Sequence, residues 1–146
     1  MKRLLYFMAI LIASFAFMAN INAQTTYYVK ENGSGNGATW ADAASLQNAL
    51  ENAVSGDTIV VAKGVYVPTK EAGDDVSLDE RDKAFVIAAG VSVYGGFSGD
   101  ESEVSISDRN LAANETILSG VIGNTGTAAD SVYHVVVAVA NTNENI

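Results

Sequence analysis

The residues of this chain that could do chemistry are few and widely spaced. His134 is the only histidine among 146 residues, and the chain contains no cysteine. A general base needs a hydrogen-bonding partner and a cleft, and neither a second histidine nor a serine motif accompanies His134. We therefore assign no catalytic residue, and expect His134 to have a structural place at the start of an apolar segment.

Carboxylates form two clusters of the oxygen ligands that calcium prefers. One cluster lies in the segment TKEAGDDVSLDERDK, and the other follows YGGFSG. The spacing does not match an EF-hand loop, and basic residues lie among the acids of the first cluster. We expect solvated loops, and the candidates for a calcium site are Asp74, Asp75, Asp79 and Asp100.

Glycine and aromatic residues suggest two kinds of binding site. Gly33–Ala38 (GSGNGA) has the G-x-G-x-x-A spacing of a dinucleotide-binding turn. Because no further β-α units follow, we interpret it as a loop and predict no cofactor. Aromatic rings can stack on sugars, and Trp40, Tyr66 and Tyr94 are candidates for this role. Alternatively, such rings form internal ladders that keep neighbouring strands in register.

The first 23 residues have the organisation of a secretory signal peptide. Lys2 and Arg3 precede the apolar run Leu4–Met18, and Ala23 is a small residue at the cleavage position. The run is short for a membrane span of about 20 residues. We therefore expect cleavage after Ala23, a secreted chain without a stable membrane span, and a location outside the cell or on its outer surface.

The charge and the lack of cysteine limit the partners and the sources of stability. The formal net charge is −9 at pH 7. An acidic surface repels nucleic acids and anionic membranes, so we expect no nucleic-acid partner. Without disulfides, an exported chain must gain its stability from burial, a metal or a long cooperative stack.

The elements are predicted from changes in periodicity. Thr25–Lys30 has the β-branched and aromatic residues of a strand. In Ala41–Val54 the apolar residues recur every three or four positions, which predicts an amphipathic helix. Thr39 or Asp42 could cap its start, and Gly56 lies where a C-terminal glycine is expected.

Short apolar segments rich in β-branched residues then recur, at Thr58–Ala62, Ala84–Gly90, Val91–Phe97, Thr116–Gly120 and Tyr133–Ala140. Triplets such as IVV, FVI and VVV are typical of parallel strands buried on both faces. A repeat of roughly 20 to 25 residues favours a solenoid with one such segment per turn. An antiparallel sandwich is the alternative.

These patterns divide the chain into three parts. They are a signal peptide (1–23), a segment with a strand, a glycine loop and a helix (24–56), and a strand-rich part (57–146) with a charged loop (69–83).

Residues 27–69, and above all Gly56–Tyr66 with the form G-D-x-I-x-V-x-x-G-x-Y, resemble the opening of secreted bacterial proteins of the pectate-lyase-like superfamily. The resemblance implies an all-β, right-handed parallel β-helix capped by the helix. Ile59 and Val61 should then point inward and lie directly beneath residues of the next turn. Antiparallel pairing of this strand with both neighbours would contradict the prediction.

The resemblance also implies a function. We expect a secreted or surface β-helix segment that is structural, adhesin-like or carbohydrate-interacting. The alternative is the cap region of a carbohydrate-active enzyme, such as a calcium-dependent polysaccharide lyase or a glycoside hydrolase. In similar lyases the catalytic groups lie on later coils, so no catalytic residue is carried over. The helix covers one end of the stack and Asn141–Ile146 cannot cover the other. We therefore expect an incomplete stack, whose partners are extracellular polysaccharide or the remaining coils of a longer chain.

Overall fold

The computed structural model describes residues 23–73, 79–123 and 128–140. The predicted signal peptide up to residue 22, and the candidates Asp74 and Asp75, lie outside these ranges. Among the regular elements of the described part, strands predominate and there is one α-helix, as expected for an all-β fold. Its elements are β1 (Thr26–Val29), α2 (Leu46–Asn52), β2 (Thr58–Ala62), β3 (Gly64–Tyr66), η1 (Glu80–Asp82), β4 (Phe85–Ile87), β5 (Ser92–Phe97), η2 (Ile106–Asp108), β6 (Thr116–Leu118), η3 (Ala128–Asp130) and β7 (Val136–Ala138).

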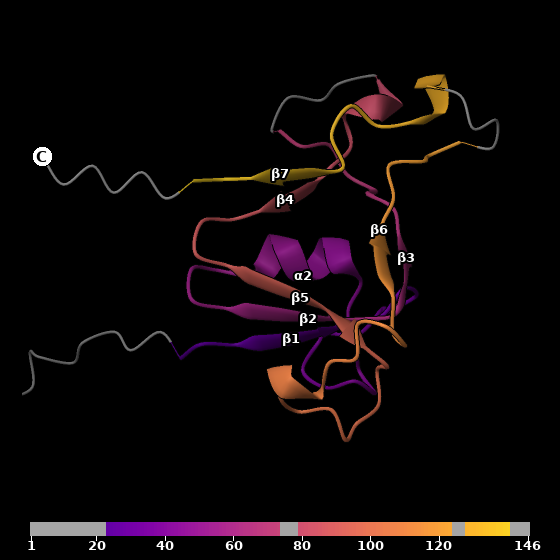
Figure 1. Ribbon diagram of the computed structural model, residues 1–146. Helices are drawn as coiled ribbons and strands as arrows, with labels where there is room; N and C mark the ends of the chain where they lie inside the picture. Colours follow the sequence, from indigo (N-terminus) through magenta and orange to yellow (C-terminus); the bar gives the residue numbers. More distant parts are fainter. Residues whose placement is uncertain (1–22, 74–78, 124–127, 141–146) are drawn as a thin grey trace, which may run out of the picture.

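The strands form three sheets in the orders β1-β2-β5, β3-β6 and β4-β7, and every pairing between these strands is parallel. Parallel pairing rules out the antiparallel sandwich for this part of the chain. Figure 1 shows α2 between the β1-β2-β5 sheet and the β4-β7 sheet, with β3 and β6 along one side. The strands β2, β3 and β4 thus pair, in that order, with β5, β6 and β7.

The prediction that each turn of the repeat contains a single apolar segment is wrong. Successive segments belong to different sheets, so that Thr58 lies beside Ser92, Gly64 beside Thr116, and Phe85 beside Val136. The chain passes through the three sheets twice, and β1 adds a further strand to the first sheet. Corners such as Lys63-Gly64 are short, and apolar content alone does not show that the sheet changes there.

The helix α2 is shorter than predicted. Residues 41–44 were expected to be helical, but Ala44 forms a parallel bridge with Val29 of β1, and its amide donates to the Tyr28 carbonyl at 2.9 Å. Ser45 is the N-cap, and its hydroxyl accepts a hydrogen bond from the Asn48 amide at 3.2 Å. The predicted caps Thr39 and Asp42 and the predicted stop at Gly56 are therefore wrong, because the helix already ends at the C-cap residue Ala53.

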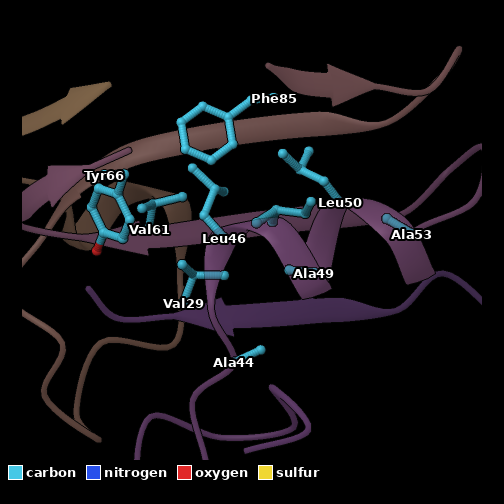
Figure 2. Close-up of a cluster of buried hydrophobic side chains, with 10 residues drawn as sticks. Val29, Ala44, Leu46, Ala49, Leu50, Ala53, Val61, Tyr66 and Phe85 are labelled. Atoms are coloured by element: carbon cyan, nitrogen blue, oxygen red, sulfur yellow. The ribbon is translucent and has the colours of Figure 1, made fainter. Parts of the chain in front are cut away.

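One face of β2 packs into an inner core. Ile59 and Val61 are buried there with Leu46, Leu50 and Phe85. Figure 2 shows Leu46 and Leu50 of α2 projecting toward Phe85 of β4. The inward orientation of Ile59 and Val61 is confirmed.

We predicted that Ile59 and Val61 each lie directly beside a residue of the next strand layer, and this register is confirmed only for Ile59. Ile59 lies beside Val93 of β5. Val61 lies beside Val29 of β1, but on the β5 side the register shifts between Val60 and Ala62. Ala62 pairs with Phe97, which leaves Gly95 and Gly96 as the extra length of a bulge in β5.

The opposite face of β2 is also buried. Val60 and Ala62 pack with Trp40 and Phe97 in a second cluster, to which Tyr28 and Tyr94 add partly buried rings. Burial on both faces explains why β2 is a continuous apolar run instead of an alternating one. Within the described residues, no helix is long and apolar enough to cross a membrane.

Candidate functional site

Trp40 is part of the core. Its side chain is 1% exposed, and its ring centroid lies 5.0 Å from that of Tyr28 and 5.8 Å from that of Phe97. The indole Nε1 donates to the Glu103 backbone carbonyl at 2.9 Å. A buried ring offers no face to a sugar, so the structure excludes Trp40 as a sugar-stacking residue and agrees with the alternative of internal packing.

Tyr66 is buried as well, and its hydroxyl donates to the Ala62 carbonyl at 2.9 Å. Burial, and then the negative charge of Glu31, raise the pKa of the Tyr66 phenol. The structure therefore excludes Tyr66, like Trp40, as a residue that stacks on a sugar. Tyr94 is half-buried, with the Arg109 guanidinium carbon 5.4 Å from its ring centroid, and it keeps part of its ring accessible.

The two candidate calcium ligands that the structure describes hold local turns. Asp79 accepts hydrogen bonds from the Arg81 amide and the Tyr133 hydroxyl, both at 3.0 Å, and these bonds lower its pKa. Asp100 accepts from the amide and hydroxyl of Ser102 at 2.9 and 2.8 Å, which lowers its pKa in the same way. Across the described ranges no three His, Asp or Glu side chains form a metal-binding group. Calcium binding stays a prediction.

A pocket of about 550 Å³ opens at the carboxyl end of the β1-β2-β5 sheet. We call it the glycine-loop pocket, and its walls are residues 30–35, 40–43, 62, 63 and 98. Lys30, Lys63 and Ser98 each follow directly after the last residue of a strand in this sheet. Parallel strands bring their carboxyl ends to one edge of the sheet, which is why residues distant in sequence meet in this pocket.

Close backbone packing shapes the glycine loop. A Cβ atom on Gly33 would lie 2.2 Å from the Ala44 carbonyl oxygen, and one on Gly35 would lie 2.4 Å from the Asp42 carbonyl oxygen. The Gly35 amide donates to the Ala43 carbonyl at 2.8 Å. The glycines of the G-x-G-x-x-A pattern thus permit contact between backbones, in agreement with our interpretation of the segment as a loop.

The two lysines of the pocket differ from the other basic residues of the described chain. The ammonium groups of Lys30 and Lys63 form no ion pair and donate no hydrogen bond there, although the Lys30 ammonium lies 6.0 Å from the Trp40 ring centroid and its charge helps to lower the pKa of Asp100. The remaining four have partners: Lys70 with Glu51, Lys83 with Glu80, Arg81 with the Ser131 carbonyl, and Arg109 with the Gly95 carbonyl.

Our sequence reasoning did not identify Lys30 and Lys63. The available signal was that each ends or follows a predicted strand, but the register that brings them together is a long-range property. Comparison with known proteins found no matching family, no matching curated protein and no matching solved structure. The fold and the glycine-loop pocket therefore carry the functional proposal.

Proposed function

We propose that this chain is a capped segment of a right-handed parallel β-helix, belonging to a secreted or surface protein with a structural or adhesin-like role and a carbohydrate-interacting surface. The observation that carries the proposal is the ordered pairing of β2, β3 and β4 with β5, β6 and β7. Such pairing is what two successive turns of a parallel β-helix require. Connections between parallel strands of one sheet are almost always right-handed, which supports the proposed hand.

The capping role is supported by the way the outer edge of β1 is covered. The Tyr28 amide donates to the Gly37 carbonyl at 2.8 Å, and the Lys30 amide donates to the Ala44 carbonyl at 3.2 Å. The loop thus satisfies backbone groups that an edge strand would leave open to another chain. The helix α2 covers the adjacent apolar interior through Leu46 and Leu50. Repeat folds need such a cap at their ends.

Engineered disulfides test the architecture. Val65 of β3 and Ile117 of β6 are paired in register, and both are exposed. Neighbouring strands lie about 4.8 Å apart, within the Cα separation that a disulfide tolerates. Since the natural chain has no cysteine, V65C/I117C should form an intramolecular disulfide on mild oxidation while V65C/V139C should not. Equal cross-linking of both pairs, or of neither, would contradict the proposed turns.

Polysaccharide binding tests the role. We expect the mature protein to be found outside the cell or on its surface, and to be retained on an immobilised extracellular polysaccharide without shortening it. Release of unsaturated sugar products, measured by their ultraviolet absorbance, would favour the lyase alternative instead. Absence of retention on every polysaccharide tried would remove the carbohydrate role and leave a structural one.

A further inference from the structure

The glycine-loop pocket combines positive charge with neutral donors. The ammonium groups of Lys30 and Lys63 line it without an ion pair or hydrogen bond among the described residues, although the charge of Lys30 helps to lower the pKa of Asp100. Two acidic residues, Glu31 and Asp42, also line the pocket. Asp42 accepts a hydrogen bond from the Asn36 amide at 3.3 Å. Glu31 folds over the corner after β2, where its Oε2 and Cβ lie 2.8 and 3.2 Å from the position that a Cβ of Gly64 would take. In an acidic protein, two unpaired ammonium groups on one pocket mark a place for an anion.

Three uncharged polar side chains share this pocket. Asn32, Ser34 and Ser98 line it. The side chains of Asn32 and Ser34 form no hydrogen bond within the described parts of the chain, whereas the Ser98 side chain bonds to Glu103 and its hydroxyl oxygen can still accept a further hydrogen bond. An amide and two hydroxyl groups both donate and accept, which suits a ligand that carries hydroxyl groups. Trp40 also lines the pocket, but its ring is too buried to stack on a ligand.

The position of Lys30 is restricted by its surroundings. Its Cε lies 2.9 Å from the position that a Cβ of Gly99 would take, so the aliphatic stem passes over this glycine in the loop after β5. A side chain at residue 99 would displace it. Together with the backbone contacts of Gly33 and Gly35, this gives a pocket whose walls are formed before a ligand arrives, which lowers the entropy cost of binding.

We propose that the glycine-loop pocket binds a small anionic, hydroxylated ligand, in which a carboxylate or sulfate group is held by Lys30 and Lys63 and hydroxyl groups by Asn32, Ser34 and Ser98. The proposal rests on the carbohydrate-interacting role, and names the ligand class and the residues for it. Both oxyanions accept charge-assisted hydrogen bonds from ammonium groups. The net charge of −9 opposes anions at long range, so binding depends on contact and weakens as salt screens it.

Intrinsic fluorescence provides the test, because Trp40 is the only tryptophan and lies under the pocket. The mature protein is titrated with glucuronate, glucose and inorganic sulfate, and the same titrations are followed by backbone amide NMR shifts. Glucuronate should change the Trp40 emission and shift the amides of Ser34 and Ser98. Lys30→Gln and Lys63→Gln should each weaken this binding about tenfold, the effect of losing one charge-assisted hydrogen bond. Lys70→Gln, with the same loss of charge outside the pocket, should leave it unchanged.

Each outcome decides a part of the proposal. Stronger binding of glucuronate than of sulfate supports the hydroxylated ligand, and equal binding reduces it to an oxyanion site. If glucose binds as tightly as glucuronate, the proposal that the ligand must be anionic is overturned, while the carbohydrate-binding role survives. No response to any probe, with NMR spectra that show a folded protein, overturns the pocket proposal and leaves the disulfide and polysaccharide tests of the proposed function standing. Lys63→Arg keeps the charge, and should retain binding if Lys63→Gln loses it.

Discussion

The two ends of the strand stack differ in how their backbone and apolar side chains are covered. At the capped end, formed by β1, residues 31–44 and α2, the loop accepts and donates hydrogen bonds along the outer edge of β1. At the opposite end, formed by β6 and β7 and here called the open end, Ile117 is 40% exposed and Val136 is 39% exposed. The apolar character of the strands is similar at both ends, so the cover provided by neighbouring segments determines how much each residue contributes to stability.

The largest expected effect comes from truncating the same residue type at the two ends. Ile59 of β2 is fully buried, whereas Ile117 of β6 keeps 40% of its surface exposed. Ile59→Ala should lower the free energy of unfolding by about 3 kcal/mol, and Ile117→Ala by about 0.5 kcal/mol. Urea denaturation followed by Trp40 fluorescence measures both. Equal losses would mean that the open end is covered in solution.

A second pair of substitutions compares the glycines of the two ends. A Cβ on Gly33 would lie 2.2 Å from the backbone oxygen of Ala44, which cannot rotate away. At Gly120 the nearest atoms are methyl groups of Val135 and Val132, at 2.9 and 3.0 Å, which belong to side chains that can adjust. We expect Gly33→Ala to cost about 2 kcal/mol and Gly120→Ala less than about 1 kcal/mol in unfolding free energy. If Gly33→Ala were harmless, the loop would not be held against β1 as described.

Local apolar patterns predicted the strands well, and long-range pairing was what they missed. The bounds of β2, Thr58–Ala62, match the prediction because a triplet buried on both faces needs no partner to be recognised. The predicted start of α2 was wrong because residues 41–44 have helical periodicity, but Ala44 pairs with β1 and the carbonyls of Asp42 and Ala43 accept hydrogen bonds from the glycine loop. Tertiary contacts decide whether these residues become helical or pair with a strand, and such contacts override local propensity.

The site was harder to predict than the fold for the same reason. Trp40 was a candidate for stacking on a sugar, with internal packing as the alternative. It is covered by Tyr28 and by Phe97, which comes from a strand far along the chain. Lys30 and Lys63 line the same pocket only because β1 and β2 are parallel and in register. A lysine that follows a single strand does not indicate a shared pocket, whereas two lysines that follow neighbouring parallel strands do.

Glu103 links the capped end to the loop after β5, and removing its charge should have an intermediate effect. Its carboxylate accepts hydrogen bonds from the amides of Ser98, Gly99 and Asp100 at 2.9, 2.8 and 3.2 Å. Desolvation raises the pKa of Glu103, but these amides and a hydrogen bond from the Ser98 side chain outweigh it and hold the pKa below its usual 4.5. Because Glu103 is only partly buried and solvent screens its charge, we expect Glu103→Gln to cost about 1 kcal/mol in unfolding free energy near neutral pH.

The pH dependence of this effect has a defined sign. A carboxylate with a lowered pKa in the folded state stabilises the protein above its unfolded pKa, and this stabilisation is lost as the pH falls through the folded value. Denaturation curves of the wild type and Glu103→Gln should therefore differ at pH 7 and converge below about pH 4. If the difference in unfolding free energy persisted unchanged to low pH, the negative charge of Glu103 would not be the source of the stabilisation.

The smallest expected effect lies at the open end, where Tyr133 donates its hydroxyl to Asp79 at 3.0 Å and the Arg81 guanidinium carbon lies 4.1 Å from its ring centroid. The hydrogen bond to Asp79 is the main cause that raises the pKa of Tyr133 above its usual 10.0. Asp79→Asn should return this pKa toward 10.0, as measured by NMR titration of the Tyr133 ring. Since the contact is exposed to solvent, the substitution should speed amide hydrogen exchange in β7 and leave global unfolding almost unchanged. A loss of stability as large as that from Ile59→Ala would mean that the open end is held as firmly as the capped end, and the distinction between them would fail.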